Sequence, residues 1–216
     1  YAAAAKKLVA GDVGIDFVAG PTEILILAAE GDARVIAADM LAQAEHDTTA
    51  SAILVTTSEE LAKAVSAEIE RQLATLPTAA VAREAIDAAG AIYITADMDA
   101  GVEICNRLAP EHVSLHDPSL LPKIQNAGAV FLGAGSPEAA GDYAAGPSHV
   151  LPTNGAARSR GGLSSADFIK SIAVQQLSPG ALKELAPTIA TLARAEGLEA
   201  HARSIEVRFA KPTDEN

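Results

Sequence analysis

Cysteine is almost absent from this chain of 216 residues, in which Cys105 is the only one. A single thiol cannot make an intrachain disulfide, so a disulfide framework is excluded, and so is a zinc site built from several thiolates. Basic residues are also scarce: 16 Lys and Arg stand against 28 Asp and Glu, for a formal net charge of −12. This acidic balance disfavours binding to nucleic acid or to an anionic membrane surface.

Long apolar runs are lacking as well, and no basic segment precedes an apolar stretch, so the sequence predicts neither a membrane span nor a secretory leader. Core material is abundant, since 49% of the residues are hydrophobic, and a chain of this length can bury enough apolar surface to fold. We therefore expect a globular, cytoplasmic protein. Because the chain starts at Tyr1 and runs directly into Ala-rich helical sequence, we also expect it to begin inside a longer protein.

Short apolar runs rich in β-branched residues alternate with helical patterns along most of the chain. We expect strands at Ile24–Ala28, Ser51–Thr57, Ala91–Thr95, His112–His116 and Ala129–Leu132. The expected helices are Ala33–Glu45, Ser58–Leu76, Ala79–Ala89, Met98–Leu108 and Pro118–Ala127, with polar residues such as Ser58 at their starts. Continuous apolar strands separated by helices are typical of strands covered on both faces. The sequence predicts an α/β fold with a largely parallel, Rossmann-like sheet flanked by helices.

The pattern changes after Leu132, where residues 133–166 are rich in Gly, Ser and Pro. Such a stretch is typical of an ordered functional loop or of a domain boundary. Beyond it we expect helices at Asp167–Leu177 and Pro179–Val207, the second with a stripe of apolar residues along one face. The chain is therefore predicted to end in a small helical domain.

Gln43 and His46 lie at the end of the helix expected at Ala33–Glu45. A spacing of three places both side chains on one helical face, where they could converge on one metal ion. The alternative, which the spacing alone favours, is a solvated polar helix end, since a histidine is favourable near a helix C-terminus.

Glu111 and His112 follow Pro110 at the point where a helix gives way to a strand. Neighbouring side chains on an extended segment point in opposite directions, so only a bent backbone would aim both at one substrate. An acid beside a histidine suits proton transfer near neutral pH. The alternative is an ordinary polar turn.

Asp142 and His149 flank small residues in the irregular segment, which is common active-site material or simply a surface connection. Glu196 and His201 fall five apart on the last expected helix, where they suggest only a solvated face. Most of the five histidines nevertheless lie beside a carboxylate or carboxamide. That mixture of imidazole and oxygen donors suits zinc.

Five segments taken together resemble the histidinol dehydrogenase family. They are Gly14–Glu23 (GIDFVAGPTE), Leu41–Asp47 (LAQAEHD), Ala109–His112 (APEH), Gly141–Thr153 (GDYAAGPSHVLPT) and Glu196–Ser204 (EGLEAHARS). The resemblance runs in order over essentially the whole chain and covers the C-terminal half of the family's proteins. It implies an NAD-dependent oxidoreductase that converts L-histidinol through L-histidinal to L-histidine with reduction of two NAD.

The resemblance also implies a role for individual residues. The implied zinc ligands are Gln43, His46, Asp142 and His201, which also contact substrate, and the implied acid/base pair is Glu111 with His112. Substrate would further be bound by Thr22, His149 and Glu196. The family usually has Ser at the position of Thr22, so the reach of that hydroxyl is in doubt. The residues that contact NAD are not assigned.

Three domains and a homodimer follow from the same resemblance. Residues 1–21 would be the remnant of a second, nicotinamide-side Rossmann-like domain, residues 22–163 the main α/β domain, and residues 164–216 a helical dimerisation domain. His201 and Glu196 would then complete the site of the partner subunit. Two rival hypotheses remain, namely a related zinc and NAD dehydrogenase acting on another small alcohol, and a non-catalytic fragment.

Overall fold

A computed structural model describes residues 1–210 of the chain. The chain divides into two compact units, Tyr1–Ile169 and a second unit that begins at Lys170. The first unit contains a five-stranded sheet of parallel strands in the order β3-β2-β1-β4-β5. Its strands are β1 (Glu23–Leu27), β2 (Ser51–Thr56), β3 (Ala91–Ile94), β4 (His112–Leu115) and β5 (Ala129–Leu132). This is the strand order of Rossmann-like sheets, so the predicted fold class is confirmed.

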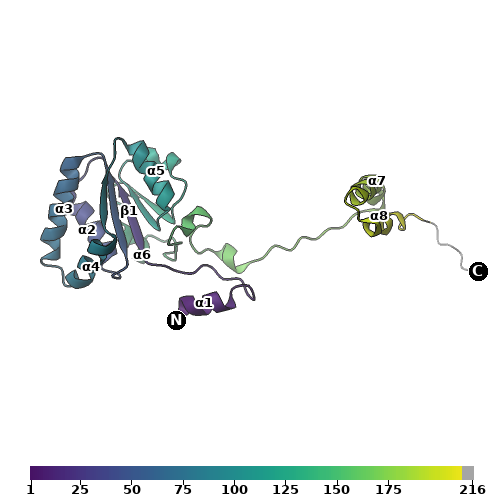
Figure 1. Cartoon of the computed structure of the whole chain (residues 1–216), viewed down its shortest axis with the longest axis horizontal. Helices are drawn as coiled ribbons and strands as arrows, with labels where there is room; N and C mark the ends of the chain where they lie inside the picture. Colours follow the sequence, from purple (N-terminus) through teal and green to yellow (C-terminus); the bar gives the residue numbers. More distant parts are fainter. Residues whose placement is uncertain (211–216) are drawn as a thin grey trace, which may run out of the picture. The chain divides into compact units, whose positions relative to one another are not determined.

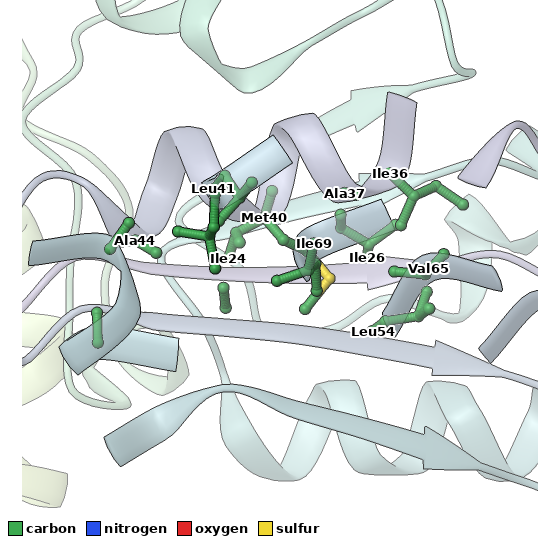
Figure 2. Packing of buried hydrophobic residues seen from close by; sticks show 14 of the residues in the cluster. Ile24, Ile26, Ile36, Ala37, Met40, Leu41, Ala44, Leu54, Val65 and Ile69 are labelled. Carbon is green, nitrogen blue, oxygen red and sulfur yellow. The ribbon is translucent and has the colours of Figure 1, made fainter. Parts of the chain in front are cut away.

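Helices cover both faces of the sheet (Figure 1). One face carries α2 (Ala33–Ala44), α3 (Glu59–Leu73) and α4 (Ala79–Ala89), and the other carries α5 (Met98–Leu108). Alternate residues of β1 serve the two faces, because Ile24 and Ile26 pack among α2 and α3 while Leu25 and Leu27 pack toward α5. Figure 2 shows the first of these clusters, with Met40 of α2 and Ile69 of α3 closing over the sheet.

The helices begin at the polar residues that the sequence indicated. The side chains of Asp32, Ser58 and Asp97 accept hydrogen bonds from backbone N–H groups in the first turns of α2, α3 and α5. These bonds satisfy donors that a helix leaves without an internal partner.

The helix expected at Pro118–Ala127 is wrong. The structure has instead a short 3₁₀ helix, η1 (Pro118–Lys123), which contains Pro122. A proline inside a helix removes a donor and crowds the preceding turn. Beyond it, the Asn106 side chain accepts hydrogen bonds from the backbone of Gln125 and Asn126, which holds that segment as a turn.

The Gly-rich stretch after β5 contains one short helix, α6 (Glu138–Tyr143), and two 3₁₀ turns, η2 (Ala156–Arg158) and η3 (Ser165–Phe168). The helix expected at Asp167–Leu177 is absent, because residues 169–177 have no regular structure. Ile172 and Val174 in this segment are β-branched and exposed. A short segment with such residues gains little helical stability unless tertiary packing buries one face.

The second unit is a pair of helices, α7 (Pro179–Ala195) and α8 (Glu199–Glu206), joined through a small cluster of Ala190, Ala193 and Ala202. The single helix expected at Pro179–Val207 is wrong, because Gly197 has a φ of +77° and ends the helical path. Glycine adopts this left-handed conformation without a Cβ penalty, as is common just after a helix. The first unit also has an N-terminal helix, α1 (Ala2–Val9). Within residues 1–210, no helix is long and apolar enough to cross a membrane.

Candidate active site

The predicted acid/base pair lies at the amino-terminal edge of the sheet, where β1 and β4 are neighbours. Thr22 directly precedes β1, and His112 is the first residue of β4, paired in register with Ile24. Because the two strands are parallel, their first residues meet at one edge. Glu111 and Thr22 therefore come together although 89 positions separate them.

The backbone bends where α5 leads into β4. Ala109 ends α5 in a left-handed conformation with a φ of +53°, and Glu111 lies at a bend before the strand. As a result the Glu111 carboxylate approaches the His112 ring, with 3.6 Å between Oε2 and Nδ1. The bent backbone that this pair required is present.

Three polar side chains form a continuous hydrogen-bonded chain at this edge. The Gln43 amide nitrogen donates to the Thr22 hydroxyl over 2.6 Å, and that hydroxyl donates to Glu111 Oε2 over 2.5 Å. The backbone N–H of Glu23 donates to the same carboxylate oxygen over 3.1 Å. Gln43 is only 1% exposed, so these bonds hold its amide in one orientation.

His112 is buried, and its two ring nitrogens have different surroundings. Nδ1 lies 3.1 Å from the backbone oxygen of Glu23, an acceptor only, so Nδ1 is the nitrogen that carries the proton. In the neutral ring Nε2 is then the nitrogen with the free lone pair, and it lies 4.0 Å from Oδ1 of Asp142 on α6. The ring also rests against Phe131 of β5, at 5.9 Å between centroids. An imidazole held in this way can act as a base at Nε2.

A hollow of about 90 Å³ lies beside His112, and its lining also includes Asp142 and His149. Three of the predicted site residues thus share one small hollow, with Phe131 and Leu151 among its apolar walls. A larger hollow of about 540 Å³ lies at the opposite, carboxyl edge of the sheet and is lined by none of the predicted residues.

The other predicted residues are exposed. α2 ends at Ala44, so His46 lies beyond the helix and is exposed, and the shared helical face expected for Gln43 and His46 is wrong. Glu196 caps the end of α7 and His201 lies on α8, both exposed in the second unit and on separate helices rather than one. Within residues 1–210, no three His, Cys, Asp or Glu side chains are grouped so as to hold a metal.

Two acidic residues of this region have no role in the sequence interpretation. The Glu23 carboxylate accepts hydrogen bonds from the backbone N–H groups of Asn154, over 2.9 Å, and of Glu111, over 3.3 Å. Burial raises the pKa of Glu23. The second is Glu138, where burial, with help from nearby carboxylates, raises the pKa to about 9. Glu23 could have been considered as a site residue, because it directly follows the predicted residue Thr22. Nothing in the sequence around Glu138 distinguishes it from a surface acid.

Comparison with known proteins gives one consistent result. A model of the histidinol dehydrogenase family matches residues 1–209. Histidinol dehydrogenase of Bacillus anthracis is 50% identical over 213 residues, which cover 97% of this chain and 50% of the relative. The Thermus thermophilus protein of the same name is 54% identical, over 96% of this chain and 51% of the relative.

A solved structure agrees with these matches. The crystal structure of histidinol dehydrogenase from Elizabethkingia anophelis superposes with a TM-score of 0.90 at 38% identity, covering 97% of this chain and 49% of that one. The chain spans about half the length of the curated relatives it matches and aligns with their C-terminal half. The chain belongs to the histidinol dehydrogenase family.

Proposed function

We propose that this chain provides the acid/base and metal-binding half of an enzyme that oxidises L-histidinol through L-histidinal to L-histidine, the last steps of histidine biosynthesis, with reduction of two NAD. The family match supports the reaction. The observation that carries the proposal is the arrangement around His112, whose Nδ1 is held by the backbone of Glu23 while Nε2 lies 4.0 Å from Asp142, with both residues lining the same hollow.

In the first oxidation His112 Nε2 accepts the proton of the substrate alcohol while hydride leaves the carbinol carbon. In the second oxidation Glu111 takes a proton from the water that attacks the aldehyde. The hydrate so formed loses the second hydride from its carbon to NAD, and His112 Nε2 accepts the proton from one of its hydroxyl groups. Thr22 and the backbone N–H of Glu23 donate to one oxygen of that carboxylate and fix its orientation. Reacting groups that are held in the right geometry react faster, because the entropy cost of bringing them together no longer contributes to the barrier.

The donor set fits a zinc ion. Gln43 uses its amide nitrogen to bind Thr22, so the amide oxygen is the end left to face a metal. With His46 and Asp142 this gives one amide oxygen, one imidazole and one carboxylate, and His201 of a second copy would complete the set. When bound, zinc would hold the substrate's amine and imidazole and so orient the carbinol carbon. The proposed enzyme is a homodimer. Its substrate pocket would be completed by Thr22, His149 and the second copy's Glu196.

NAD, when bound, would accept the hydride of each oxidation. We assign it no residues of this chain. The cytoplasmic location remains a prediction from the sequence.

The test is histidinol-dependent formation of NADH, followed by absorbance at 340 nm. The assay uses two proteins, the 216-residue chain alone and a joined chain. The joined chain begins with the part of the Thermus thermophilus relative that the 216-residue chain does not match, and the 216-residue chain follows. We expect activity from the joined chain, dependent on added Zn²⁺. No activity from a folded, zinc-loaded joined chain would contradict the proposal.

The rival hypotheses predict different results in the same assay. A dehydrogenase of another small alcohol would reduce NAD with simple diols or amino alcohols in preference to histidinol. A non-catalytic zinc-binding fragment would bind Zn²⁺ without NADH formation in either chain. Glu196 and His149 favour histidinol, because a carboxylate and an imidazole suit an amino-imidazole substrate.

A further inference from the structure

Glu138 is a buried acid that the proposed chemistry does not use. It is the first residue of α6 and is only 5% exposed. Among residues 1–210, no donor reaches its Oε2 atom and no basic side chain forms an ion pair with it. A buried carboxyl group without partners calls for an explanation, because leaving a polar group unsatisfied is costly.

The surroundings of Glu138 disfavour its charged form. α6 packs against α2, and the carboxyl groups of Asp39, Asp142 and Glu111 lie close enough to disfavour another negative charge. Burial and these neighbours raise the pKa of Glu138 to about 9. These surroundings favour the neutral acid, which costs far less to bury than a carboxylate.

Helical spacing connects this acid to the candidate site. Glu138 lies four residues before Asp142 on α6, and Asp39 lies four residues before Gln43 on α2. Residues four apart lie on the same side of a helix. α6 contacts α2, and Asp142 and Gln43 lie one turn beyond Glu138 and Asp39 on these two helices, so the packing of α6 against α2 helps to set where Asp142 lies.

We propose that Glu138 is a positioning residue, whose buried side chain fixes the packing of α6 against α2 and thereby holds Asp142 beside His112. The use of Asp142 as a zinc ligand rests on the proposed function, whereas the placement of α6 does not. Outer residues that orient a metal ligand typically change metal affinity by about 10- to 100-fold when removed.

The test compares Glu138→Gln, which has the same shape and no charge, with Glu138→Ala, which removes the side chain beyond Cβ. The control is Ile69→Ala, which opens the core cluster over α2 and α3 away from α6. Zn²⁺ alone is titrated into each metal-free 216-residue chain. We expect Glu138→Gln to bind within about threefold of the unchanged chain and Glu138→Ala to bind about 10- to 100-fold more weakly. Ile69→Ala is expected to lose stability without losing zinc affinity.

Hydrogen exchange of the α6 amides is measured on the same four proteins without zinc. We expect faster exchange in α6 for Glu138→Ala than for Ile69→Ala, and native protection for Glu138→Gln. If Glu138→Gln behaves like Glu138→Ala, a buried side chain of this shape does not hold α6 in place and the proposal is wrong. If Glu138→Ala matches Ile69→Ala in exchange, Glu138 does not position α6. A failure of the unchanged chain to bind zinc would count against the proposed function, and the exchange data would still decide the role of Glu138.

Discussion

Thr22 and Glu111, 89 positions apart, are joined by a hydrogen bond of 2.5 Å from the threonine hydroxyl to the carboxylate. The same hydroxyl accepts a bond of 2.6 Å from Gln43. One oxygen therefore links the end of α2 to the start of β4 and holds the candidate metal ligand and the candidate acid in a fixed relation.

Replacing Thr22 by valine keeps the shape of the side chain and removes this oxygen. Gln43 and Glu111 each lose a partner in a largely buried setting, so we expect the free energy of unfolding to fall by about 1–3 kcal/mol. Circular dichroism in urea is the suitable measurement, since the chain has no tryptophan. Thr22→Ser retains the hydroxyl and is expected to stay within about 1 kcal/mol of the unchanged chain. Equal losses for the two variants would show that the methyl group, rather than the hydroxyl, stabilises this edge.

His112 and Glu111 are expected to separate the two oxidations in the joined chain. His112→Asn removes the base, so oxidation of both histidinol and histidinal should fall by about 100-fold or more. Glu111→Gln preserves the size of the side chain but cannot take a proton from water, so it should chiefly slow the oxidation of histidinal. Supplying each substrate separately and following NADH distinguishes the steps. Equal losses in both steps for Glu111→Gln would contradict this division of roles.

The sequence was sufficient for the sheet and for the placement of Glu111 and His112 where β4 begins. Strands such as Ile24–Leu27 are continuous apolar runs that include β-branched residues. Pro110 predicts a turn after the preceding helix, which places Glu111 and His112 where the next strand begins. The bend itself depends on the left-handed conformation of Ala109, which a sequence pattern does not reveal.

Properties set by tertiary packing could not be predicted in this way. Glu138 has the sequence environment of an exposed helix start, yet tertiary packing buries it, with α6 in contact with α2. The break at Gly197 had a visible signal, since glycine commonly follows a helix, yet the apolar stripe running through it favoured one continuous helix. His201 and Glu196 are both exposed in the second unit, so nothing in their local surroundings distinguishes them from surface residues. Their assignment came from family resemblance alone.

Asp39 should make the stability of the metal-free chain depend on pH. Burial raises the pKa of its carboxyl to about 6, whereas an unfolded Asp titrates near pH ~3.9. Between about pH 4 and 6 the folded chain thus holds a proton that the unfolded chain has released, so the free energy of unfolding falls as the pH rises through this window. Because the side chain keeps some contact with water, we expect a cost of about 1–3 kcal/mol at pH 7.

Asp39→Asn should remove that cost. We expect the variant to be more stable than the unchanged chain at pH 7 and similar to it at pH 4, as measured by urea unfolding at several pH values. The control is Glu84→Gln, which neutralises an exposed acid on α4. A stability difference for Asp39→Asn that does not change between pH 4 and 7 would show that the carboxyl titrates normally in the folded chain.

Gly141 in α6 allows Phe131 to lie beside the candidate base. A Cβ atom at this position would come within 2.7 Å of Phe131 Cζ and 2.8 Å of its Cε1, and the same ring rests against His112. Alanine is normally favoured over glycine inside a helix by about 1 kcal/mol. We nevertheless expect Gly141→Ala to lose about 1–3 kcal/mol of stability through overpacking, and to lower kcat in the joined chain because the ring or α6 must move.

Gly135→Ala is the matched control, since a Cβ at Gly135 would meet no atom within 4 Å. A second variant isolates the cause: adding Phe131→Leu to Gly141→Ala removes the far ring atoms that the new methyl group meets. If the clash with the ring is responsible, the double variant should recover stability relative to Gly141→Ala, even though Phe131→Leu alone loses packing against His112. Independent, additive losses from the two changes would mean that Gly141 is required for a reason other than contact with Phe131.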